Sequence, residues 1–146
     1  MPGIIVGIDG SGHSQRALTW AMKEAASHDE PLTVLAVHPA VVGYAGGPLK
    51  YPQDEEMTEK ARAGAQAEAD KALAALGDAR PPSVTVTAVH GIPADVLVEA
   101  SKDADQIVMG TRGVGGFGAL LLGSVATRVA QHAHCPVTII PPENRG

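Results

Sequence analysis

The chain has few aromatic residues and only one cysteine. Its 146 residues include one Trp, one Phe and two Tyr, so Ala, Val, Leu and Ile must fill the core. Cys135 cannot form an internal disulfide, and it has no second cysteine with which to make a redox pair or a cysteine zinc site. The lone thiol favours a reducing, cytoplasmic compartment.

Basic residues are also scarce. Eleven Lys and Arg stand against sixteen Asp and Glu, which gives a net charge of −5. Nucleic-acid-binding proteins need a positive surface for phosphates, so nucleic acid is not an expected partner. The longest charge-free, largely apolar stretch, 113–127, is interrupted by glycines and falls short of the ~20 residues of a membrane helix. The N-terminus also lacks the pattern of a signal peptide, and we expect no membrane association.

Short β-branched runs alternate with longer stretches of helical period, which predicts a parallel sheet with crossover helices. A glycine- and proline-rich segment, 39–53, reads as a long, mobile loop, and Gly77 fits a helix end. There is no internal repeat or interior linker, so 1–146 reads as one domain. The predicted strands are 4–8, 32–37, 83–89, 106–110 and 136–140, and the predicted helices are 13–28, 54–76, 93–102 and a last one that ends near His134.

Five strands joined by right-handed crossovers predict an α/β fold, and in the usual doubly wound arrangement the chain winds one way through strands two and three and then reverses. We expect a Rossmann-like open parallel five-stranded sheet of order 3-2-1-4-5, with helices on both faces. Ligands bind in such sheets where the order reverses, between the carboxyl ends of the first and fourth strands. Asp9 follows the first of these strands and Gly110 ends the other, so the loops 9–12 and 110–124 should converge.

The glycine-rich segment 110–124 has the chemistry of a phosphate-binding loop. Glycines let phosphates approach the backbone and allow successive N–H groups to point inward. Gly123 and Ser124 precede the helical residues 125–128, whose free N–H groups and dipole favour an anion, and Arg112 would add a fixed positive charge. The alternative is a merely flexible loop with a helix cap at Ser124.

Other nucleotide motifs fit less well. Gly113, Gly115 and Gly118 match the spacing of a dinucleotide fingerprint, but they follow the fourth strand and no acid near position 138 could hold a ribose. The P-loop motif G-x4-G-K-S/T does not occur. A receiver domain needs a cluster of acids after the first strand, where this chain has only Asp9.

Several histidines lie near possible metal ligands. His132, His134 and Cys135 combine two ligand types, but a helix end should separate their directions, and the helix dipole explains a histidine there. His38 and His90 come after predicted strands and read as structural, although His38 could border a base pocket. We therefore expect no metal held by these histidines and Cys135.

Three pieces of the chain, in order, resemble the universal stress protein family. Gly110-x2-Gly113-x9-Gly123-Ser124 fits that family's nucleotide-binding pattern G-x2-G-x9-G-S/T. The segment 4–18 is similar to its first strand and helix, and 135–137 is similar to the approach to its last strand. The likeness extends from about residue 4 to residue 141.

The resemblance implies an ATP-binding domain with the same strand order, because members that keep the glycine motif bind ATP. Asp9 would contact the ribose or a bound Mg²⁺, and the Val37 backbone would meet adenine. Ile8 and Met109 would line the base pocket. The ribose and phosphates would be surrounded by Gly110, Arg112, Gly113, Gly123, Ser124 and Val125.

The resemblance also implies a stress-response module that acts on an unknown protein partner or on its own dimer through ATP-dependent conformation. The alternative is an enzyme, a slow ATPase or phosphotransferase. Hydrolysis needs a positioned base or water-orienting group, and Asp9 is the only carboxylate near the motif loops. We therefore expect binding without efficient turnover.

The last predicted strand, 136–140, is short, apolar and uncharged, and it should form a sheet edge. Such an edge tends to pair with another chain unless it is covered. The family resemblance implies the same, since its members commonly dimerise through antiparallel pairing of this strand. Pro136 and Pro141 would limit the pairing to a few residues and favour a closed homodimer.

Overall fold

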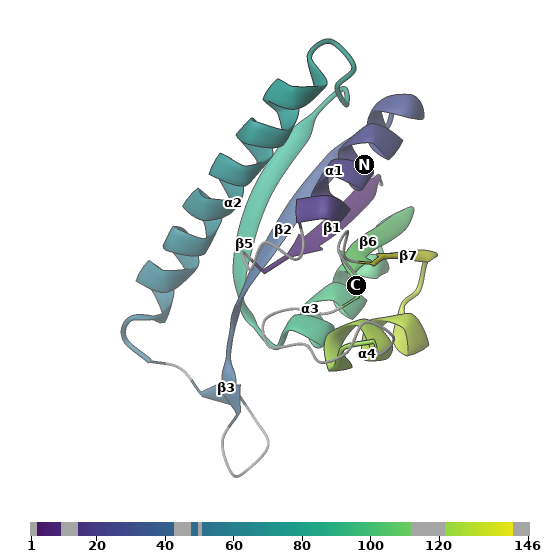
Figure 1. The fold of residues 1–146 in the computed structure, drawn as a ribbon. Coiled ribbons are helices and arrows are strands. Elements are labelled where there is room, and N and C mark those ends of the chain that lie inside the picture. The colour runs from purple at the N-terminus through teal and green to yellow at the C-terminus, as the bar shows by residue number, and fades with distance from the viewer. Residues whose placement is uncertain (1–2, 10–14, 43–47, 50, 112–121, 142–146) are drawn as a thin grey trace.

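A five-stranded parallel sheet forms the centre of the fold (Figure 1). The computed structural model describes residues 3–9, 15–42, 48–49, 51–111 and 122–141. The sheet order is β5-β2-β1-β6-β7, which confirms the predicted order 3-2-1-4-5. Its strands are β1 (Ile4–Ile8), β2 (Leu32–Pro39), β5 (Val84–Gly91), β6 (Gln106–Gly110) and β7 (Val137–Ile140).

Helices cover both faces of the sheet. On one face lie α1 (Gln15–Ser27) and α2 (Asp54–Leu76), and on the other lie α3 (Pro93–Ser101) and α4 (Ser124–His132). Successive residues of a strand point to opposite faces, which divides the core into two layers. Ile4 and Val6 pack toward α1 and α2, whereas Leu35 and Ile107 pack in the layer with α3 and α4.

Gly7 in β1 allows α3 to pack closely against the sheet. Ser101 at the end of α3 contacts the segment that precedes β7. A Cβ on Gly7 would lie 2.9 Å from Cδ2 of Leu97, so a larger residue in β1 would force the Leu97 side chain of α3 to shift. At the end of α3, the buried Ser101 hydroxyl donates to the Val98 carbonyl at 2.6 Å and accepts from the His134 N–H at 2.9 Å. The hydrogen bond from His134 to Ser101 thus joins the chain that precedes β6 to the chain that precedes β7.

Two neighbouring strands are longer than the sequence predicts. β2 continues to Pro39 and β5 to Gly91, because these two residues are paired across the same ladder. The ladder is followed by a hydrogen bond of 2.8 Å from the Ala40 N–H to the Gly91 carbonyl. His38 and His90 therefore lie within strands and directly opposite one another, not after the strands as predicted.

The prediction of a continuous loop over 39–53 is wrong in part. β3 (Val41–Val42) and β4 (Pro48–Leu49) form a two-stranded antiparallel ribbon. Backbone pairing needs only a few extended residues on each side, so the glycines between the two strands do not prevent it, and Pro48 itself lies in β4. Residues 43–47 and 50 of this segment lie outside the described residues.

The other bounds agree with the sequence to within a few residues. α2 spans 54–76 as predicted, with Gly77 as its C-cap, and Pro93 occupies the first turn of α3. The first helix is described from Gln15, since 10–14 lie outside the described residues. No helix in the described ranges is long and apolar enough to cross a membrane.

Two glycines at α2 should respond in opposite ways to alanine. Gly64 lies inside the helix, and a Cβ there would have no atom within 4 Å, so Gly64→Ala should raise the free energy of unfolding by about 0.5–1 kcal/mol. Gly77 has a φ of +62°, where an L side chain is strained, so Gly77→Ala should lower that free energy. Urea unfolding of both variants measures the difference, and equal shifts of the same sign would contradict the assignment.

Candidate functional site

The strand order reverses between β1 and β6, and the predicted ligand crevice lies at their carboxyl ends. β1 pairs in parallel with β2 on one side and with β6 on the other. Asp9 follows β1 and is exposed, whereas Gly110 ends β6 and is buried. In open α/β sheets this is where ligands bind.

A single hydrogen bond brings the two ends of the glycine motif together. The Gly123 N–H donates to the Thr111 carbonyl at 2.7 Å, which places the start of α4 beside the end of β6. Ser124 is exposed and Val125 is half-buried in the first turn of α4. The N–H groups of a first helical turn have no acceptor within the helix, so they are available to an anion.

Glycine at position 123 is not required by the backbone conformation. Gly123 has a φ of −68° and a ψ of 166°, which any residue adopts, and it occupies the N-cap position of α4. The helix cap is therefore Gly123, one residue before the Ser124 cap of the alternative prediction, while residues 112–121 of that loop lie outside the described residues.

The structure separates two residues predicted to line one base pocket. In the pairing of β1 with β6, Val6 lies opposite Val108. Met109 is therefore level with Gly7, and Ile8 lies one residue further along β1 than Met109 does along β6. The Ile8 side chain is buried in the layer of α1 and α2, whereas Met109 is buried in the layer of α3 and α4. Val37 lies in the same layer as Met109.

Arg112 and Gly113, the remaining predicted phosphate contacts, lie outside the described residues.

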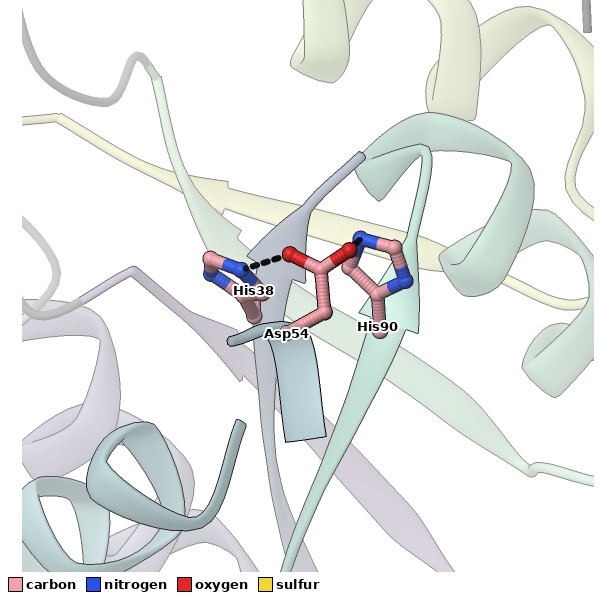
Figure 2. Close-up of side chains that lie close together, drawn as sticks. All are labelled: His38, Asp54 and His90. Carbon is pink, nitrogen blue, oxygen red and sulfur yellow. Dashed lines mark hydrogen bonds and ion pairs between the residues drawn. The ribbon is translucent and has the colours of Figure 1, made fainter. Parts of the chain in front are cut away.

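A second group of polar side chains gathers at the carboxyl ends of β2 and β5. Figure 2 shows His38 and His90 on either side of the Asp54 carboxylate. His38 Nε2 lies 3.1 Å from Oδ1 of Asp54, and His90 Nε2 lies 3.4 Å from Oδ2. The exposed fractions of the three side chains are 22%, 17% and 15% for His38, His90 and Asp54.

The fold brings these three residues together from distant parts of the sequence. His38 and His90 are direct partners in the β2–β5 ladder, and their ring centroids are 5.1 Å apart. Asp54 is the first residue of α2, which packs on that face of the two strands. The Tyr51 N–H donates to Asp54 Oδ2 at 2.7 Å and, together with His38 and His90, holds the pKa of this carboxyl below its ordinary value.

The other candidate metal ligands do not converge. Among the residues that the structure describes, only His38, Asp54 and His90 form a group that could hold an ion. Cys135 Sγ contacts the Pro136 carbonyl at 3.4 Å, and burial raises the pKa of this thiol. His132 and His134 instead line an open groove between α3 and α4 with Asp95 and Arg128, which form an ion pair of 3.1 Å.

Comparison with protein families settles which family this is. The model of the universal stress protein family matches residues 2–141. The chain belongs to the universal stress protein family.

Two curated relatives show the extent of the likeness. A universal stress protein of Mycolicibacterium smegmatis is 36% identical over 140 residues, covering 94% of this chain and 47% of the relative. One from Thermus aquaticus is 35% identical over 142 residues, covering 94% of this chain and 96% of the relative. The chain spans about half the length of the first curated relatives that it matches.

A solved universal stress protein in complex with cAMP has a similar structure. It is 26% identical, with a TM-score of 0.66, and the match covers 96% of both chains. This universal stress protein thus shares the family's Rossmann-like fold.

Proposed function

We propose that this universal stress protein binds ATP in the crevice at the carboxyl ends of β1 and β6. The observation that carries the proposal is the hydrogen bond from Gly123 to Thr111. It brings the two ends of the G-x2-G-x9-G-S/T motif together where the strand order reverses. A related protein of this fold is in complex with cAMP, which supports an adenine nucleotide as the ligand class.

The residues around the crevice suit the parts of ATP. The Val37 backbone and the Met109 side chain would meet the adenine, and Ile8 would contribute only backbone. Gly110, Gly123, Ser124 and Val125 would surround the ribose and phosphates, with the N–H groups of α4 aimed at an anion. Arg112 and Gly113 belong to the same motif and complete the proposed set.

Asp9 is the proposed contact for the ribose or for Mg²⁺ carried by ATP. Its exposed carboxylate follows β1 at the reversal point. Carboxylate oxygen is a preferred Mg²⁺ ligand, and Mg²⁺ commonly binds proteins through one carboxylate together with substrate phosphates. The residue type therefore fits the ion.

We propose that bound ATP changes the protein's dimer or its affinity for a protein partner, and that turnover is not its task. A phosphoryl-transfer enzyme needs a group that positions water or an acceptor in addition to phosphate contacts. Of the described residues 8–9, 110–111 and 122–125 around the crevice, only Asp9 carries a carboxylate. One residue cannot both hold Mg²⁺ and act as a dedicated base.

Calorimetry should show ATP binding in the micromolar range, without competition by NAD. Gly123→Val should abolish this binding, because a side chain there would occupy the space of the phosphates, while φ and ψ at this position accept valine. Gly64→Ala, far along α2, is the matched control and should bind ATP normally. A folded Gly123→Val variant with unchanged affinity would refute the loop assignment.

The purified protein should hydrolyse ATP far below the ~10 per second median of enzymes. The reason is that no general base accompanies Asp9 among the described residues of the crevice. A phosphate-release assay on the wild type and Asp9→Asn measures this. A robust rate that Asp9→Asn removes would instead favour the alternative, a slow ATPase or phosphotransferase.

We further propose that the protein forms a homodimer through β7. β7 is at the edge of the sheet and pairs with β6 on one side. The Ile107 N–H donates to the Pro136 carbonyl at 3.0 Å, so in this parallel ladder Thr138 points its backbone groups toward β6. Val137 and Ile139 then present theirs to the open edge, where a second copy could pair.

Ile139→Pro should release monomers, because it removes an N–H that faces the open edge. Thr138→Pro is a less informative change, since the ladder indicates that its N–H serves β6 within the same chain. Light scattering at tens of micromolar should find the wild type dimeric and Ile139→Pro monomeric, with circular dichroism as the folding control. A monomeric wild type would sink the proposal.

A further inference from the structure

We propose that His38, Asp54 and His90 form a binding site for a divalent transition-metal ion of the zinc class. This site is separate from the proposed nucleotide crevice. It lies on the face of the sheet covered by α2, at the ends of β2 and β5 (Figure 2).

The donor set selects the kind of metal. Two imidazoles and one carboxylate suit Zn²⁺ and similar first-row ions, and the same 2-His-1-carboxylate composition occurs in catalytic zinc sites. Mg²⁺ and Ca²⁺ prefer oxygen ligands, so a site with two histidines disfavours them. The ligand types therefore point to a transition metal.

The spacing of the donor atoms is close to what such an ion requires. The three atoms, one from each residue, lie within 4.8 Å of one another. Zn²⁺ bonds of about 2.0–2.2 Å in a tetrahedron separate neighbouring ligand atoms by about 3.3–3.6 Å. His38 Nε2 lies 3.1 Å from Oδ1 of Asp54 and His90 Nε2 lies 3.4 Å from Oδ2, so each histidine faces a different oxygen of the carboxylate.

The three ligands are held in place by the fold itself. His38 and His90 are fixed opposite each other by the β2–β5 ladder, with their rings inclined by 31°. The Asp54 carboxylate is held by the Tyr51 N–H and lies at the N-terminus of α2, where the helix dipole favours a negative charge. A preformed site of this kind needs little ordering when the ion binds.

The site is also accessible. Its side chains are partly exposed, and three protein ligands leave one coordination position for water or another small ligand. An ion here would join β2, β5 and the start of α2, and so would tie together both ends of the segment 39–53. Its first effect would be to stabilise this end of the molecule.

Cobalt provides a direct spectroscopic test. Titrating the full chain with Co²⁺, with no nucleotide present, should produce the visible absorption of a four- or five-coordinate ion, and added Zn²⁺ should displace it. His90→Gln should weaken Co²⁺ binding by about 100-fold or more, since even loss of an outer-shell partner costs 10- to 100-fold. His132→Gln, which changes an exposed histidine on α4, is the matched control and should bind as the wild type does.

Thermal unfolding gives an independent readout. Zn²⁺ should raise the melting temperature of the wild type and of His132→Gln, but not that of His90→Gln, because an ion that binds only the folded state stabilises it. If His90→Gln does not fold, His38→Gln takes its place. A wild type that shows no Co²⁺ absorption at millimolar Co²⁺ would overturn the proposal. Binding that survives in a folded His90→Gln but is lost in Asp9→Asn would also overturn it, by moving the ion to the nucleotide crevice.

Discussion

The parallel direction of the sheet strands is the constraint on which both candidate sites depend. Parallel strands place all their carboxyl ends at the same edge of a sheet, so residues far apart in the sequence meet there. β1 and β6 bring Asp9 and Gly110 to this edge, and β2 and β5 bring His38 and His90. An antiparallel pairing of β2 with β5 would send the two histidines to opposite ends.

The two faces of the sheet then assign these residues to different environments. Val37 packs in the layer of α3 and α4, while its neighbour His38 points to the face of α2 and meets Asp54. Neighbouring residues of one strand thus belong to two separate candidate sites.

The sequence was sufficient to predict the strand order, the bounds of α2 and the capping role of Gly77, because each rests on local pattern or on chirality rules. It was not sufficient for features that depend on register between strands. The separation of Ile8 from Met109 follows from the pairing of Val6 with Val108, and the β3–β4 ribbon depends on backbone pairing. The histidine cluster was missed for the same reason, although histidines near the ends of two strands expected to be neighbours were a usable signal.

The hydrogen bond between Gly123 and Thr111 has a consequence for how this fold can change over evolution. It joins the two residues that flank the segment 112–122, since Thr111 follows β6 and Gly123 precedes α4. The positions of both ends of that segment are therefore set by β6 and α4. The entropic cost of closing a loop grows only with the logarithm of its length. Residues could therefore be inserted or removed there at little cost to the sheet, and ligand preference could diverge among relatives while the scaffold stays the same.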